Sequence, residues 1–112
     1  MKSETNENKI AQLQLLDQNL QQILMQKQQY QSQIIEIDNS LEELEKSKGN
    51  VYKIVGAIMV NGDKEELKKE LLSKKELVEL RIKSFEKQEN QIKEKIDALQ
   101  SEVMLEMKKK VE

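Results

Sequence analysis

The fold is decided by ten residues near the middle of the 112-residue chain, Val51-Tyr52-Lys53-Ile54-Val55-Gly56-Ala57-Ile58-Met59-Val60. β-Branched residues dominate this stretch, as is typical of strands, and Gly56 offers a point of reversal. We predict two short strands, 51–55 and 58–60, that reverse near Gly56-Ala57 and form a β-hairpin. Because no further strand follows, Asn61-Gly62-Asp63 is interpreted as the turn into the next element.

Both flanking segments carry the seven-residue repeat of a coiled coil. The first, 9–47, has its seam at Leu13, Leu16, Leu20, Ile23, Lys27, Tyr30, Ile34, Ile37, Leu41 and Leu44. The second, 63–110, has its seam at Leu71, Lys75, Val78, Ile82, Phe85, Glu89, Ile92, Ile96, Leu99 and Val103. Proline is absent and the three glycines lie within 49–62, so nothing interrupts either segment. The sequence therefore predicts a mainly α fold, a long antiparallel coiled-coil hairpin with a short central β-hairpin.

The start of the second helix and the register of the seam can both be estimated. Asp63 is expected to cap the helix, with Glu66 reaching back toward it. A reversal centred near Gly56 places two residues opposite one another when their numbers sum to about 112. Most seam positions then meet an apolar partner. The polar positions match less well, because Lys27 falls opposite Phe85 and Ile23 opposite Glu89.

The β-hairpin is expected to be apolar on both sides, because alternate residues of a strand face opposite ways. We predict one side from Tyr52, Ile54, Ile58 and Val60, and the other from Val51, Val55, Ala57 and Met59. An isolated two-stranded hairpin is marginally stable in water, and its edges leave backbone groups unpaired. We therefore predict that the hairpin joins strands of other chains in an intermolecular β-barrel or larger sheet. The alternative is an apolar loop packed over the end of its own coiled coil.

Composition excludes several classes of function. The chain has no Cys and no His, which removes thiolate nucleophiles, imidazole bases, disulfides and the usual zinc ligands. No glycine-rich phosphate loop is present, so we expect no catalytic site, no metal and no cofactor. A net charge of −2 argues against nucleic acid, and no apolar run is long enough for a membrane span. A soluble cytoplasmic protein is the expectation.

Apolar residues also gather near both chain ends, where the seam cannot absorb them. Val103, Met104, Leu105 and Met107 are almost consecutive, so they cannot all lie on one helix face. In the estimated register they lie opposite the polar stretch 5–9. Flexible methionine side chains suit surfaces that accept varied shapes. Packing against a neighbouring subunit explains the same residues equally well.

The order of helix, Val-Tyr-Lys-Ile-Val-Gly-Ala-Ile-Met-Val hairpin and helix resembles the beta-class subunits of prefoldin. The resemblance covers essentially the whole chain as a single domain, 1–112, with the hairpin at 51–60, and its specific part is that central stretch. It implies a hexameric chaperone of two alpha-class and four beta-class subunits, including other copies of this chain. It also implies an ATP-independent holdase whose coiled-coil tips capture unfolded proteins for a group II chaperonin.

The resemblance also implies roles for particular residues. Assembly would depend on Val51, Tyr52, Ile54, Val55, Gly56, Ile58, Met59 and Val60. Unfolded clients would contact Ile10, Leu13, Leu16, Val103, Met104, Leu105 and Met107.

Two other classes of function compete with the chaperone hypothesis. A structural coiled-coil adaptor would use the hairpin only to dimerise or dock, and it would bind folded partners instead of unfolded ones. A helical hairpin that binds RNA would need a basic stripe, but acidic and basic residues balance along the second helix. An enzyme is least compatible with the pattern, because the carboxylates interleave with lysines as ordinary surface pairs.

Overall fold

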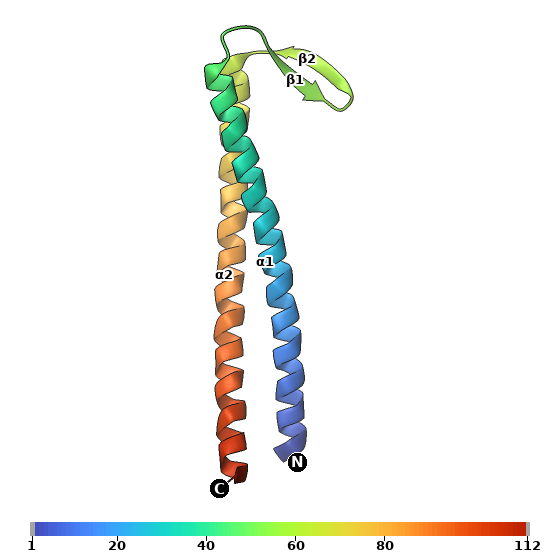
Figure 1. The fold of residues 1–112 in the computed structure, drawn as a ribbon, viewed down its shortest axis with the longest axis vertical. Coiled ribbons are helices and arrows are strands. Elements are labelled where there is room, and N and C mark those ends of the chain that lie inside the picture. The colour runs from blue at the N-terminus through green and yellow to red at the C-terminus, as the bar shows by residue number, and fades with distance from the viewer. Residues whose placement is uncertain (1, 112) are drawn as a thin grey trace. The chain divides into compact units, whose positions relative to one another are not determined.

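A computed structural model describes the backbone of residues 2–111 and the side chains of residues 6–109. Within that range the chain forms helix α1 (Lys2–Lys46), strand β1 (Val51–Val55), strand β2 (Ile58–Gly62) and helix α2 (Lys64–Val111). It divides into two compact units. Unit 1 joins residues 1–27 with 84–112, and unit 2 is the continuous segment 28–83. In each unit the α1 and α2 segments lie side by side and antiparallel, and unit 2 adds the β-hairpin (Figure 1).

The core of each unit is a narrow seam between the two helices. Every predicted seam position of α1 and α2 is buried or half-buried, and most residues between those positions are exposed. The most deeply buried apolar residues are Ile23, Ile37, Leu44, Val78 and Val103. None of the described side chains is completely buried, as expected when two helices share a single stripe of contact. The heptad pattern therefore predicted the core of this fold correctly.

Lys27 and Glu89, two polar positions of the seam, bond to each other. The Lys27 ammonium donates a hydrogen bond to Glu89 Oε1 over 3.1 Å. Glu89 lies four residues beyond Phe85, the residue that the estimated register placed opposite Lys27. The prediction that Glu89 is mismatched opposite Ile23 is therefore wrong. The stem of Lys27 is long enough to reach a carboxylate one helical turn away.

The β-hairpin turns through Gly56 and Ala57. Val55 pairs with Ile58 across the turn, and Gly56 has a φ of 62°, a conformation that side chains with a Cβ atom rarely adopt. Positive φ at the first of two loop residues is the geometry of a type II′ turn, whose twist suits a tight hairpin. Strand β2 runs two residues further than expected, since Gly62 pairs with Val51, so the turn into α2 is confined to Asp63.

The pairing register corrects the predicted sides of the hairpin. Residues directly opposite in an antiparallel pair share a side. Ile54 lies opposite Met59, so Met59 belongs with Ile54 and not with Val55. A two-residue turn pairs even with odd residue numbers, whereas the prediction had kept even numbers together. One side is therefore formed by Tyr52, Ile54, Met59 and Asn61, and the other by Val51, Lys53, Val55, Ile58 and Val60.

Hydrogen bonds at the adjoining helix ends fix the chain where it enters and leaves the hairpin. Asp63 Oδ1 accepts from the backbone N–H of Glu65 over 3.2 Å, which confirms Asp63 as the cap of α2. The Lys64 ammonium donates to the carbonyl oxygens of Glu45 and Ser47, over 3.3 and 3.1 Å. These carbonyls lie in the last turn of α1 and just beyond its end, where a cation is favourable. A few polar contacts thus hold the base of the hairpin.

Candidate interaction surfaces

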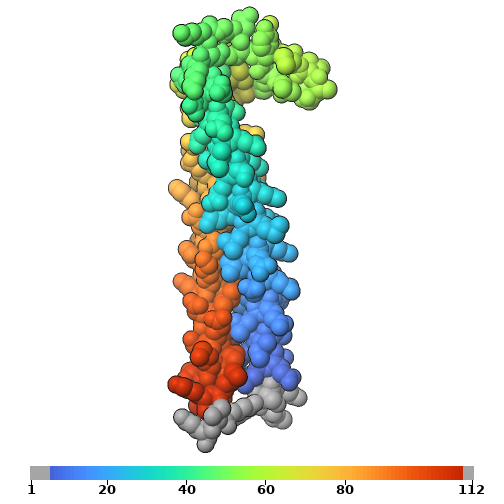
Figure 2. Space-filling view, in the orientation of Figure 1, coloured from blue at the N-terminus to red at the C-terminus, as the bar shows by residue number. Residues whose placement is uncertain are grey.

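The β-hairpin is not covered by the helices of its own unit. Ile54 is 71% exposed, and Ile58 and Met59 are each 65% exposed. The hairpin stands clear of the helix ends in the space-filling view (Figure 2). The alternative of an apolar loop packed over its own coiled coil is therefore wrong. Of the predicted assembly residues, Val51 is half-buried, while Tyr52, Ile54, Val55, Gly56, Ile58, Met59 and Val60 are exposed.

A groove of about 670 Å³ lies in unit 2 between strand β1 and the adjoining helix ends. Its apolar lining includes Leu44, Leu67 and Leu71 from the helices, together with Val51, Tyr52 and Ile54 of β1. The Lys53 ammonium lies 2.8 Å from Glu70 Oε2 and links the strand to α2. The edge of β1 therefore borders a groove with both apolar and charged lining residues, as well as open solvent.

The predicted client residues fall into two groups according to burial. Ile10, Met104, Leu105 and Met107 are exposed, Met104 most of all at 69%. Leu13 and Leu16 are half-buried and Val103 is buried, because these three side chains belong to the seam. The structure thus places part of the predicted set on the surface and part between the helices.

The three exposed client residues predicted on α2 do not form one continuous patch. They are Met104, Leu105 and Met107. A helix turns about 100° per residue, so Met104 and Met107 lie about 60° apart and share a face. Leu105 lies about 100° from Met104 and about 160° from Met107, on another side of the helix. Met104 and Met107 form the methionine face, the name used for this pair below.

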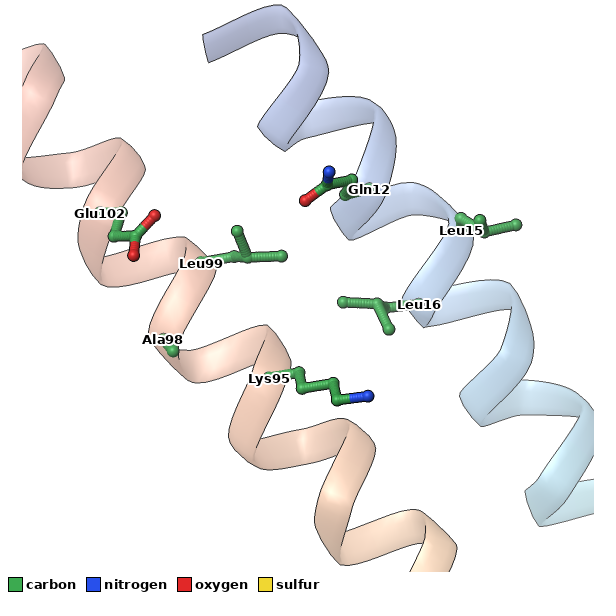
Figure 3. Close-up of a pocket in the computed structure, with 7 residues that line it drawn as sticks. All are labelled: Gln12, Leu15, Leu16, Lys95, Ala98, Leu99 and Glu102. Atoms are coloured by element: carbon green, nitrogen blue, oxygen red, sulfur yellow. The ribbon is translucent and has the colours of Figure 1, made fainter. Parts of the chain in front are cut away.

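A second apolar surface of unit 1 is a shallow groove of about 370 Å³ (Figure 3). Leu16 and Leu99 point toward one another between the helices, whereas Leu15 points away from α2. The lining residues are Gln12, Leu15, Leu16, Lys95, Ala98, Leu99 and Glu102. Only Leu16 had been predicted as a client contact. The signal that could have indicated the groove is Leu15, an apolar residue beside the seam position Leu16.

The seam of unit 1 ends in a polar layer near the chain ends. The Lys9 ammonium lies 2.7 Å from Glu106 Oε1 and 3.3 Å from Glu102 Oε2. The hydrogen bond to Glu106, and then that to Glu102, raises the pKa of Lys9 above its ordinary value. Asn6 is also buried here. The sequence predicted polar residues opposite this end of α2, but not that Lys9 would bond to α2.

Neither a metal cluster nor a membrane-spanning helix is found in the part of the chain that the structure describes. It holds no cluster of three or more Asp, Glu, His or Cys side chains placed to ligate a metal. None of its helices combines the length and hydropathy of a membrane span.

Comparison with known proteins identifies the family. The Prefoldin subunit family model matches residues 7–110. Prefoldin subunit beta of Archaeoglobus fulgidus is 39% identical over 99 residues, which are 87% of this chain and 85% of that protein. The Caldivirga maquilingensis prefoldin subunit beta is 35% identical over 98 residues, 86% of this chain and 81% of that one. The crystal structure of the prefoldin beta subunit from Thermococcus strain KS-1 superimposes with a TM-score of 0.85 at 32% identity, covering 88% of this chain and 89% of that one.

Proposed function

The chain belongs to the family of prefoldin beta subunits, which are chaperone subunits, and we propose that it serves as an ATP-independent holdase subunit. In this proposal two alpha-class subunits and four copies of this chain form a cytoplasmic hexamer. The assembly captures unfolded proteins and passes them to a group II chaperonin. The observation that carries the proposal is the β-hairpin with both of its apolar sides uncovered.

Assembly is the first part of the proposed function. Both sides of the hairpin expose aliphatic side chains, and burial of each against other chains would contribute about 1.5–3 kcal/mol. The free strand edges would gain the backbone hydrogen bonds that two strands cannot supply to each other. Burial of aliphatic side chains and formation of backbone hydrogen bonds therefore both favour strand pairing between chains.

Client capture is the second part. The methionine face and the groove around Leu15 offer apolar contacts on different sides of unit 1. Each contact is small, but an assembly holds several chains together, each with its own pair of helices. This raises the effective concentration of binding sites around a client. Unfolded chains expose apolar residues in no fixed arrangement, which suits flexible methionine side chains. Capture of a client therefore depends on several weak contacts made by separate chains of the assembly.

An aggregation assay tests the proposal directly. The chain is assembled with an alpha-class prefoldin subunit and added, without ATP, to a denatured protein that is diluted from denaturant. We expect the assembly to suppress light scattering, and M104S/M107S to raise the concentration needed for half-protection several-fold. The matched control is L77S/L80S, a pair equally spaced on α2 and similarly exposed at 54% and 58%, which should change little.

The outcomes separate the proposed function from its alternatives. Unchanged protection by M104S/M107S would remove the methionine face from the client site. If the wild-type assembly binds a native protein as well as its denatured form, the chain is an adaptor and not a holdase.

A further inference from the structure

In unit 1 the surface of α1 carries far less charge than the surface of α2. Between residues 10 and 26, Asp17 is the only charged residue among 17, whereas residues 86–102 of the neighbouring α2 hold eight (Figure 1). Gln21 donates a hydrogen bond to Asp17 over 3.4 Å, so even this charge has a partner within α1. The other exposed polar residues of the segment are six glutamines and one asparagine. The two helices therefore present different chemistry to solvent.

Helix formation does not require this lack of charge. Glutamine, glutamate and lysine have similar helix propensities, so charged residues would serve equally well in α1. Charges four residues apart would also add ion pairs, as Glu89 and Lys93 do on α2 over 2.8 Å. Charged side chains further favour solubility. The lack of charge is therefore better explained by what contacts this part of α1 than by the helix itself.

Five exposed residues form a stripe on the side of α1 opposite the seam. They are Ala11, Leu15, Gln18, Gln22 and Met25, at alternating spacings of four and three. At about 100° and about 1.5 Å per residue, they lie within about 80° of one another and extend over about 21 Å. These five residues are called the uncharged face of α1 below. Leu15 also lines the shallow groove, so the uncharged face continues an apolar surface.

We propose that the uncharged face of α1 is a further contact surface for unfolded polypeptides, whereas the charged side of α2 is not. This inference rests on the proposed holdase function and specifies how clients are bound. Unfolded chains carry backbone N–H and C=O groups, and a glutamine amide can both accept from the former and donate to the latter. A client that covers an amide displaces no ionic hydration, whereas a client that covers the charges of α2 does so at a much larger cost.

An extended chain suits the uncharged face better than a second helix does. The seam between α1 and α2 has an apolar residue at every position from Leu13 to Ile23, but Gln18 and Gln22 separate Leu15 from Met25. Leu15 and Met25 lie about 15 Å apart along the helix, a distance that about five residues of extended chain span. Flexible methionine also adapts to partners of varied sequence.

Photo-cross-linking tests the proposal, because the chain has no cysteine and a single one can be introduced. Q18C on the uncharged face is compared with E94C, an exposed residue at the same heptad position of α2. M107C reports on the methionine face. Each variant is labelled with benzophenone maleimide, assembled with an alpha-class prefoldin subunit, mixed with a denatured fluorescent protein without ATP and irradiated. We expect Q18C to cross-link several-fold more client than E94C.

The outcomes distinguish this inference from the proposed function. Equal yields from Q18C and E94C would overturn the inference, and so would cross-links from Q18C chiefly to another subunit, which would make the face an interface within the assembly. Capture by M107C but not by Q18C would leave the holdase function standing without the uncharged face. Capture at no position, with no suppression of aggregation by the wild-type assembly, would overturn the proposed function and this inference with it.

Charge placed on the uncharged face gives an independent test. Q18E/Q22K adds a Glu–Lys pair four residues apart, which favours the helix and leaves the net charge unchanged. It should raise the concentration needed for half-protection in the aggregation assay several-fold, because the added charges lose hydration on contact with a client. K87Q/E94Q removes one charge of each sign from exposed positions of α2 and should match wild type. Wild-type protection by Q18E/Q22K, with unchanged helical circular dichroism, would contradict the proposal.

Discussion

At the scale of single residues, Glu89 shows how a charged group is accommodated in a helix seam. Its two oxygens accept from lysines on different helices, Lys27 on α1 and Lys93 on α2. Both carboxylate oxygens thus have a hydrogen-bond donor, although the residue is buried in the seam. The sequence marks Glu89 as a break in the heptad pattern, but only the three-dimensional register shows that the break has a partner.

The charge of Glu89 makes part of the stability depend on pH. Folding lowers the pKa of this carboxyl below its ordinary value of 4.5, so the unfolded chain binds more protons near that pH. The stabilisation is therefore complete above pH 4.5 and is lost as the pH falls through the lower pKa of the folded state. We expect E89Q to unfold with about 1 kcal/mol less free energy at neutral pH and to flatten this acid dependence.

The comparison for E89Q is E45Q, measured by urea unfolding at several pH values. The pKa of Glu45 is also lowered, chiefly by its hydrogen bond with Lys68, but the Glu45 side chain is 56% exposed. E45Q should therefore change stability less. An acid dependence that is identical in E89Q and wild type would contradict the assignment of a seam ion pair.

At the scale of secondary-structure elements, the helices were more predictable than the hairpin surfaces. A heptad seam is local information, so each predicted position from Leu13 to Leu44 is buried or half-buried. The strands were also found from composition, because β-branched residues gather around Gly56. The two sides of the hairpin were predicted wrongly, because one residue more or less in the turn changes which side chains share a face.

The interaction surfaces could likewise be predicted from the sequence only where they depend on local pattern. The exposed position of Met104 could be inferred, because four apolar residues in close succession cannot share one seam. Leu15 could have indicated an apolar surface beside the seam, but not the groove itself, which combines Leu15 of α1 with Ala98 of α2. Two residues so distant in sequence become neighbours only through the register of two helices.

The β-hairpin leads to a prediction about assembly. I54D places a carboxylate on the side formed with Tyr52 and Met59, where burial against another chain would leave the charge unpaired. We expect the I54D chain to lose most of its association in sedimentation velocity while its helical circular dichroism stays unchanged. I58D tests the opposite side in the same way.

The matched control for the hairpin is N61D, a substitution at a position that is already polar on the side of Ile54. It should associate as wild type does. Normal association of I54D and I58D would show that neither apolar side is used between chains.

At the scale of the whole molecule, two kinds of surface are carried by different units. The hairpin belongs to unit 2, and the methionine face and the apolar groove belong to unit 1. The helices α1 and α2 pass through both units, so one chain can contribute to assembly with one part and contact clients with another. This separation explains why substitutions in the hairpin and at the methionine face are expected to affect different measurements.

Native mass spectrometry of the chain, alone and with an alpha-class prefoldin subunit, tests the central claim most directly. The claim is that the uncovered hairpin is completed by strands of other chains. With the partner present, we expect a hexamer that contains four copies of this chain and dissociates when I54D is introduced. A folded monomer in both samples, with hairpin amides protected from hydrogen exchange, would contradict it.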